Sequence, residues 1–426
     1  MPYFLLLCFY LTIKDHSYII IKYNRLNKVG DFMLNKNMLA LGTASSAIRQ
    51  LFEYGKARKA EIGEDNVYDF SIGNPSVPTP KSVDETIKNL INNEDSVLLH
   101  GYTSAPGDLN VRTKIANYIQ EKSGVKATAA NIYMTCGAAA SLTITLNALA
   151  NDGDEIILLA PFFPEYRVFA QKAGFKCVVV NCREPDFQID IETLKNAINK
   201  NTKAIIINSP NNPTGVVFNE ETILALSNLL NQKETELGKD IFLISDEPYR
   251  ELVYGGVDVP YVQKYYSNTI VCYSFSKSLS LPGERIGYIY VSPNCKDSDL
   301  VFAAVCGAGR ALGYVCAPSM LQKVVAENLG NTADLSIYNK NREILYNALT
   351  EYGYTAVNPD GAFYLFVKSP EKDAAAFADK AKKYELLLVP SDSFGMGGYV
   401  RISYCVSTAQ IENSLPSFKA LIKEYK

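Results

Sequence analysis

Residues 271–290, VCYSFSKSLSLPGERIGYIY, place a lysine directly after an apolar run with the composition of an interior β-strand. Lys277 follows Ser274 and Ser276, and Arg285 stands eight residues beyond it. A buried lysine is unfavourable unless it is paired, neutralised or covalently modified. The rest of the chain must therefore supply a partner for this amine or a group that modifies it.

Similar apolar runs recur along the chain from about residue 130. We expect strands within residues 131–135, 155–160, 176–182, 203–210, 241–248, 269–275 and 285–292. Several of these runs are almost continuously apolar, which is typical of parallel strands covered on both faces. Helical patterns such as 142–150 and 220–232 fall between some of them. The alternation predicts an α/β domain with a mostly parallel, seven-stranded sheet.

The pattern changes past about residue 325, which predicts a second, smaller α+β domain. A long helix is expected at about 318–350, a shorter one at 372–384, and strands near GAFYLFVK (361–368), LLLVPSD (386–392) and YVRISYCV (399–406). We therefore expect residues 76–325 to form the large domain, 326–426 the small domain, and 33–75 to pack with the small one. Pro416 should start or kink the last helix, because proline disrupts a helix interior.

The N-terminal stretch resembles neither a signal peptide nor a membrane span. YFLLLCFYLTI (3–13) is apolar, but no positively charged region precedes it and no small-residue cleavage site follows. It is also too short to cross a bilayer, which takes about 20 apolar residues. We expect residues 1–32 to be a non-native or disordered leader, with the chain proper beginning near Met33 or Met38.

Charge, cysteine content and histidine content argue against several classes of partner and catalytic site. The net charge is −3 and no basic block or basic amphipathic helix is present, which argues against nucleic-acid and membrane partners. Nine cysteines without C-x-x-C spacing indicate reduced thiols in a cytoplasmic protein. With only two histidines, a Ser-His-Asp relay or a histidine-rich metal site is disfavoured, so we expect no metal.

Candidate ligand-binding residues follow the carboxyl ends of the expected strands, where open α/β sheets bind ligands. Asp246 directly follows IFLIS (241–245), five residues expected to be buried, and Tyr249 comes three positions later. The other candidates at strand ends are Gly137, Ala138, Ala139, Phe163 and Asn212, in addition to Ser274, Lys277 and Arg285. Taken singly, the Gly-Ala turn, the aromatic ring and the N-P-x-G turn each fit ordinary packing or turn formation.

Taken together, these residues supply an amine, an acceptor carboxylate, hydrogen-bonding groups, an aromatic platform and an anion cradle with an arginine. That combination matches the needs of pyridoxal phosphate, whose aldehyde reacts with a lysine and whose ring nitrogen pairs with a carboxylate. Covalent attachment would also remove the free buried ammonium of Lys277.

At this point the chain resembles the fold-type I, class I aminotransferases of the aspartate aminotransferase type, from about Ser71 to the C-terminus. The matching blocks, in family order, are FSIGNPSVPTP, GYTSAPGDLNVR, TCGAAASL, APFFPEY, NSPNNPTG, SDEPY, SFSKSLSLPGERIGY, GAFYLF and VRISY. The resemblance implies a two-domain transferase that uses pyridoxal 5'-phosphate and forms a homodimer with shared active sites.

The resemblance also implies a role for each matching residue. Lys277 would form the Schiff base and carry the proton, and Asp246 would pair with the pyridine nitrogen. Asn212 and Tyr249 would bond the ring oxygen, and Phe163 would stack on the ring. The phosphate would be bound by Gly137, Ala138, Ala139, Ser274, Arg285 and, from the neighbouring subunit, Tyr102. Arg401 would hold the substrate carboxylate with Gly73 and Asn212 alongside, since a guanidinium fork suits a carboxylate. Two departures from many relatives are Phe163 in place of tyrosine and Ala139 without a hydroxyl.

Other functions stay open at this stage. A carbon–sulfur lyase on the same fold would use the same lysine, aspartate and arginine. A transcription regulator with an aminotransferase-like domain would carry a basic winged helix, and no such footprint precedes the first motif. Among aminotransferases, aspartate with 2-oxoglutarate leads, with aromatic amino acids or alanine behind. Arg310 is the candidate for binding a second substrate carboxylate, although a structural salt bridge explains it equally well.

Overall fold

The computed structural model describes residues 34–43 and 47–426. The chain divides into two compact units, residues 1–50 and 51–426. Helix α2 (Lys36–Thr43) belongs to the first unit, and α3 (Ala47–Ile62) begins there and continues into the second. The leader predicted over residues 1–32 lies outside the described residues. Within the described ranges, no helix is long and apolar enough to cross a membrane.

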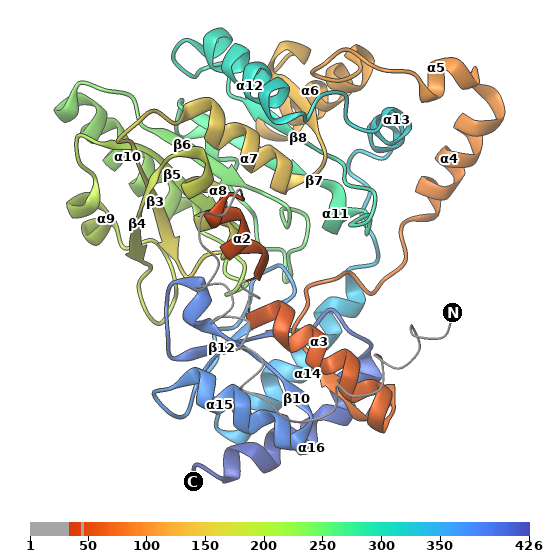
Figure 1. Ribbon diagram of the computed structural model, residues 1–426, viewed down its shortest axis with the longest axis vertical. Helices are drawn as coiled ribbons and strands as arrows, with labels where there is room; N and C mark the ends of the chain where they lie inside the picture. The colour runs from red at the N-terminus through yellow and green to blue at the C-terminus, as the bar shows by residue number, and fades with distance from the viewer. Residues whose placement is uncertain (1–33, 44–46) are drawn as a thin grey trace. The chain divides into compact units, whose positions relative to one another are not determined.

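A seven-stranded sheet dominates the second unit (Figure 1). Its strand order is β2-β8-β7-β6-β5-β3-β4, and all neighbours are parallel except those of β8, which runs antiparallel to both β2 and β7. The strands are β2 (Ile132–Thr135), β3 (Glu155–Ala160), β4 (Lys176–Asn181), β5 (Thr202–Asn208), β6 (Phe242–Asp246), β7 (Thr269–Ser274) and β8 (Gly287–Val291). The predicted mostly parallel sheet is confirmed. Each strand lies inside its expected segment, except that β5 begins one residue before it.

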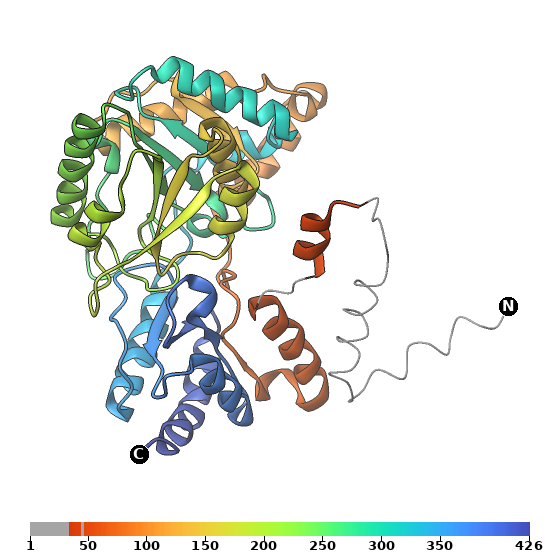
Figure 2. The same cartoon turned by 60° about the vertical axis from the view of Figure 1, so that its left-hand side comes forward.

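Helices cover both faces of this sheet, which explains why its central strands are apolar throughout. On β7, Cys272 lies 3.5 Å from Thr145 of α7, while the next residue, Tyr273, packs into the core formed with α6 and α13 on the other face. The helices of this part are α4 (Lys81–Asn93), α5 (Ser96–His100), α6 (Leu109–Ser123), α7 (Ala138–Leu149), α8 (Glu165–Ala173), α9 (Ile191–Ala197), α10 (Glu220–Leu237), α11 (Phe275–Ser278), α12 (Ser298–Leu312) and α13 (Ser319–Glu327). Figure 2 shows the sheet enclosed between them.

The C-terminal part has its own core and two small sheets. One is antiparallel with the order β11-β12-β9, and the other pairs β1 with β10 in parallel. The elements are β1 (Tyr68–Asp69), α14 (Ser336–Tyr352), β9 (Tyr364–Lys368), α15 (Ala374–Ala381), β10 (Leu386–Leu387), β11 (Val389–Pro390), β12 (Tyr399–Ser403) and α16 (Thr408–Lys423). Arg58 of α3 also forms an ion pair of 2.6 Å with Glu385. We keep 33–75, 76–325 and 326–426 as proposed domain limits.

The helix prediction is wrong for residues 318–350, and for the last helix the structure excludes one of the two expected outcomes, a start at Pro416. The long helix expected over 318–350 is two helices, α13 and α14, because Gly330 between them adopts a left-handed conformation with φ 82°. The last helix does not start at Pro416. It starts at Thr408, where the Ser407 side chain caps it by accepting from the N–H of Gln410, and Pro416 lies inside it.

Candidate active site

Several predicted residues meet at one edge of the seven-stranded sheet. Asp246 ends β6 and Ser274 ends β7, and Lys277 follows on the single-turn helix α11. Arg285 precedes β8, which runs antiparallel to β7, so the start of β8 lies at this same edge. The carboxyl ends of parallel strands are where such sheets bind ligands, and the topology therefore brings these four side chains together.

Lys277 is half-buried, and its amine has no counter-charge among the described residues. Its Nζ donates a hydrogen bond of 2.7 Å to the carbonyl of Gly73 and lies 5.3 Å from the ring centroid of Phe363. Among residues 34–43 and 47–426, no carboxylate forms an ion pair with it. Burial lowers the pKa of Lys277 to about 8, and the positive charges of Arg285 and Arg401 lower it as well, while the Cys405 thiol acts in the opposite direction. The amine is therefore partly neutral near physiological pH.

Asp246 is a buried carboxyl with one free oxygen. It is 5% exposed, its Oδ2 accepts a short hydrogen bond from the Tyr166 hydroxyl, and its Oδ1 has no partner. Burial raises the pKa of Asp246 to about 7; the Tyr166 hydrogen bond lowers it and the neighbouring Glu247 raises it. A buried oxygen without a partner is unfavourable, so Oδ1 is available to a donor from a ligand.

Arg401 provides a buried positive charge from β12. It is 2% exposed; Nη1 donates to Asn212 Oδ1 at 3.1 Å and Nη2 to the carbonyl of Ser71 at 2.6 Å. Nε has no partner, and burial lowers the pKa of the guanidinium. The rings of Tyr364 and Phe394 flank it at 4.7 and 5.2 Å. Its described partners are all neutral, so an anionic ligand would supply the missing counter-charge.

Hydrogen bonds tie Asn212 and Tyr249 into the same site. The Asn212 N–H donates to Asn208 Oδ1 at 2.7 Å, and Asn208 Nδ2 donates to the Asp246 carbonyl at 2.9 Å. The Tyr249 hydroxyl lies 2.9 Å from the hydroxyl of Tyr364. These contacts fix the loops after β5 and β6 relative to each other and to β9.

Gly73 approaches this group so closely that a side chain would not fit. A Cβ on Gly73 would lie 2.0 Å from the Tyr364 hydroxyl oxygen. Its carbonyl is the acceptor for the Lys277 amine. The segment containing Gly73 therefore lies against the lysine, and the predicted role of Gly73 in substrate binding stays a prediction.

A separate cluster of donors stands at the start of α7. Gly137 has φ 84°, and a Cβ there would lie 2.9 Å from Arg285 Nη2. Arg285 itself is exposed, has φ 53°, and donates through Nη1 to the Pro282 carbonyl at 2.9 Å. Ala138 and Ala139 form the first turn of α7, whose backbone N–H groups point to this region. These N–H groups and the guanidinium form a setting suited to an anion.

Hydroxyl groups stand at the start of α11. Ser274 accepts a hydrogen bond from the Ser276 N–H at 3.2 Å, and the two side-chain oxygens lie 2.8 Å apart. Phe163 lies on the turn after β3, half-buried, with its ring 5.7 Å from that of Tyr166 and perpendicular to it.

Two predicted residues are not brought to this group within the chain. Tyr102 is 97% exposed, and Arg310 is exposed near the end of α12. Over the described ranges, no hydrogen bond or ion pair joins either side chain to the residues above. Nor does any carboxylate there pair with Arg310, so the salt bridge considered from the sequence is not formed within this part of the chain.

The sequence interpretation missed three aromatic residues of the site. Tyr166 holds Asp246, Tyr364 contacts both Tyr249 and Arg401, and Phe363 lies beside the Lys277 amine. All three stand inside the blocks APFFPEY and GAFYLF. Their roles depend on contacts between residues far apart in the sequence, which the blocks alone do not indicate.

Comparisons with known proteins show the family and support the fold. Residues 65–418 match the family model for aminotransferase class I and II. A probable aspartate aminotransferase of Methanocaldococcus jannaschii is 30% identical, covering 89% of this chain and 97% of that protein. An aromatic-amino-acid aminotransferase of Thermococcus litoralis is 27% identical over 89% of this chain and 96% of that protein. The crystal structure of an amino transferase from Eubacterium rectale is 54% identical, with a TM-score of 0.91, and covers 93% of this chain and 100% of that one.

The lowered pKa of Lys277 predicts an unusually reactive amine in the ligand-free protein. Since only the neutral amine reacts, labelling by a small amine-selective reagent should rise with a midpoint at about pH 8. The same residue in urea-unfolded protein should show the ordinary lysine value of about 10.4. Peptide mass spectrometry across pH measures both. Arg401→Gln should raise the midpoint, because it removes a positive neighbour, and a folded-state midpoint equal to the unfolded one would refute the argument.

Proposed function

The chain belongs to the class I and II aminotransferases, and on that premise we propose that it binds pyridoxal 5'-phosphate at Lys277 and transfers the amino group of aspartate to 2-oxoglutarate. One observation carries the proposal. In the part of the chain that the structure describes, a half-buried amine without a counter-charge lies at a sheet edge where a buried oxygen of Asp246 and a buried nitrogen of Arg401 both lack partners. A ligand with a reactive carbonyl and a ring N–H would satisfy the amine and Asp246. A substrate with a carboxylate would satisfy Arg401.

The residues present fit the cofactor. The free Oδ1 of Asp246 suits the protonated ring nitrogen. We assign the hydrogen bonds to the ring oxygen to Asn212, which is linked to Asp246 through Asn208, and to Tyr249, three residues after Asp246. The space that a Cβ on Gly137 would fill lies against Arg285, which suits a phosphate. We assign the remaining phosphate contacts to Ala138, Ala139 and Ser274, and the ring-stacking contact to Phe163.

When bound, pyridoxal phosphate supplies a carbonyl for covalent attachment and a ring that accepts electrons. The chain supplies the proton transfers. With a pKa of about 8, Lys277 Nζ is able to accept the proton from substrate Cα and to return it later. Asp246 would hold a proton on the ring nitrogen, and the Tyr166 hydrogen bond orients that carboxyl group. The Gly73 carbonyl and the Phe363 ring orient the amine.

Arg401 is proposed to bind the α-carboxylate of the substrate. Its guanidinium is already oriented by Asn212 and Ser71 and lies between two aromatic rings, so binding requires little reordering of the side chain. The charge-assisted hydrogen bonds of a carboxylate would replace the unfavourable burial of an unpaired cation. The Asn212 side chain therefore contacts Arg401, while its backbone N–H joins the hydrogen bonds that lead through Asn208 to Asp246.

We further propose a homodimer in which Tyr102 and Arg310 act on the partner's site. Tyr102 is 97% exposed, and the neighbouring Val97 and Leu98 are 79% and 73% exposed, an apolar surface suited to a second copy. Arg310 has no carboxylate partner in the part of the chain that the structure describes. It is therefore free to bind the distal carboxylate of a dicarboxylic substrate.

A spectrophotometric assay distinguishes the aminotransferase from a lyase. We expect purified protein with pyridoxal phosphate to consume 2-oxoglutarate in equal amount to the aspartate that disappears. Lys277→Ala should abolish turnover, because it removes the amine that is proposed to bond to the cofactor and to carry the proton. A lyase would instead release ammonia and pyruvate from a suitable amino acid with no 2-oxo acid added. Either that result or near-wild-type turnover by Lys277→Ala would contradict the proposal.

A panel of amino donors tests the substrate assignment. Arg310→Ala should lower kcat/KM for aspartate about 10- to 100-fold, the loss expected for a hydrogen bond to a charged group. Alanine, which has no distal carboxylate, should be almost unaffected and serves as the internal control. If the wild type uses aspartate no better than alanine, the dicarboxylate assignment fails.

Mixing two variants tests whether Arg310 acts across the dimer. Heterodimers of Lys277→Ala and Arg310→Ala subunits contain one site with an intact lysine and an intact arginine from the opposite subunit. Aspartate turnover should therefore reappear after subunit exchange. If Arg310 served its own subunit, no site in the mixture would be complete and turnover would stay low.

A further inference from the structure

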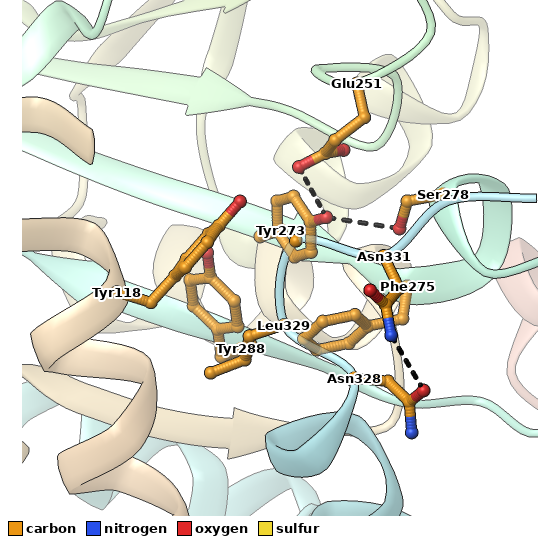
Figure 3. Close-up of a pocket in the computed structure, with 10 residues that line it drawn as sticks. Tyr118, Glu251, Tyr273, Phe275, Ser278, Tyr288, Asn328, Leu329 and Asn331 are labelled. Atoms are coloured by element: carbon orange, nitrogen blue, oxygen red, sulfur yellow. Dashed lines mark hydrogen bonds between the residues drawn. The ribbon is translucent and has the colours of Figure 1, made fainter. Parts of the chain in front are cut away.

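Three hydrogen-bonded side chains, Glu251, Tyr273 and Ser278, connect two segments that carry residues of the site (Figure 3). The hydroxyl of Tyr273 donates to Glu251 Oε1 at 2.9 Å, and the hydroxyl oxygen of Ser278 lies 3.2 Å from that of Tyr273. Glu251 stands two residues after Tyr249, and Ser278 directly follows Lys277. One phenol therefore bridges the segment that carries Asp246 and Tyr249 to the turn that carries Lys277.

The turn that carries Lys277 depends on such contacts because it is very short. Helix α11 has four residues, Phe275–Ser278, and a helix of one turn has little stability of its own. Ser274 caps its start. At its other end, the Ser278 carbonyl accepts from the Ala333 N–H at 2.8 Å, and the Ser278 hydroxyl reaches Tyr273. The contact with Tyr273 connects this turn to the segment after β6, because Tyr273 is also bonded to Glu251.

The phenol is held rigidly enough to act as a spacer. Its ring stacks on that of Tyr288 at 4.8 Å with an interplanar angle of 19°, and meets Phe275 edge-on at 5.0 Å. Tyr273 is 5% exposed, so its hydroxyl has little access to water as an alternative partner. Burial raises the pKa of Tyr273 well above its ordinary value, which keeps the hydroxyl protonated and able to donate.

The segment at the other end of the chain is also fixed. Glu247 forms a buried ion pair of 2.6 Å with Arg250, which in turn donates to the carbonyls of Val259 and Pro260. Glu251 follows this clamp directly. Its second oxygen, Oε2, is buried without a partner in the described chain, so the Tyr273 hydroxyl is the one hydrogen-bond donor that holds its carboxyl group there.

We propose that Tyr273, held by Glu251 and bonded to Ser278, is a positioning residue that sets where the Lys277 amine stands relative to Asp246 and Tyr249. The inference rests on the proposed function, since it assigns a role within cofactor attachment. Tyr273 contacts neither the amine nor the reacting atoms, and acts through the turn on which Lys277 lies. A displacement of this turn by a fraction of an ångström would misplace the amine, and misplacements of about 1 Å reduce rates by about 100-fold.

The test compares Tyr273→Phe with Tyr290→Phe. Tyr290 lies on β8, the strand next to that of Tyr273, and is also buried. Its hydroxyl has no hydrogen-bond partner among the described residues, so Tyr290→Phe removes the same oxygen atom without breaking a hydrogen bond. Stopped-flow absorbance follows the attachment of pyridoxal phosphate to Lys277 in the cofactor-free protein. We expect Tyr273→Phe to slow attachment and lower kcat about tenfold, with KM for the amino donor little changed. Tyr290→Phe should match the wild type.

The readouts separate this inference from its premise. If wild-type protein does not attach pyridoxal phosphate, the proposed function fails. If the wild type attaches it and Tyr273→Phe does so equally fast, the positioning role is wrong. A melting temperature lowered equally by both phenylalanine variants, with attachment unchanged, would assign the hydroxyl a role in stability alone and would also overturn the inference.

Variants at the two ends of the chain keep the test valid if Tyr273→Phe fails to fold. Ser278→Ala removes the hydroxyl next to Lys277 and should slow attachment to a similar extent. Glu251→Gln retains an oxygen acceptor and should restore most of the rate that Glu251→Ala loses. Equal rates for Glu251→Gln, Glu251→Ala and the wild type would show that the bridge has no positioning role.

Discussion

The partial burial of the Lys277 amine, with no counter-charge among the described residues, is the constraint on which the rest of the site depends. A cation in this position is disfavoured by desolvation and by two neighbouring arginines, which is why its pKa falls to about 8. A carboxylate beside it would remove the problem and also the reactivity. The chain instead offers a carbonyl acceptor from Gly73, which accepts a hydrogen bond from either protonation state of the amine.

Two other polar groups of the site also have only some of their hydrogen-bonding atoms paired. Asp246 and Arg401 are each held by neutral partners and each keep one buried atom without a hydrogen bond. Unsatisfied buried atoms are unfavourable in the free protein. A ligand with complementary charges would satisfy these atoms, which supports the proposed binding of a cofactor and an anionic substrate.

Much of this site was predictable from local sequence. The seven strands follow from apolar runs, and Asp246, Asn212 and Lys277 follow from polar residues placed where those runs end. Gly330 shows a limit, because a single glycine divided a helical pattern that otherwise continued. Tyr166, Tyr364 and Tyr273 show a second limit. Their roles arise from contacts across the fold, 80 residues from Tyr166 to Asp246 and 115 from Tyr249 to Tyr364, and no local pattern specifies them.

The central claim is that the amine at position 277 forms a covalent bond with pyridoxal phosphate. The most direct measurement is borohydride reduction of the protein after addition of the cofactor, followed by peptide mapping. The account predicts one phosphopyridoxyl group per chain, located on the peptide that contains Lys277. A protein that stays colourless with the cofactor, or an adduct spread over surface lysines with none at Lys277, would contradict it.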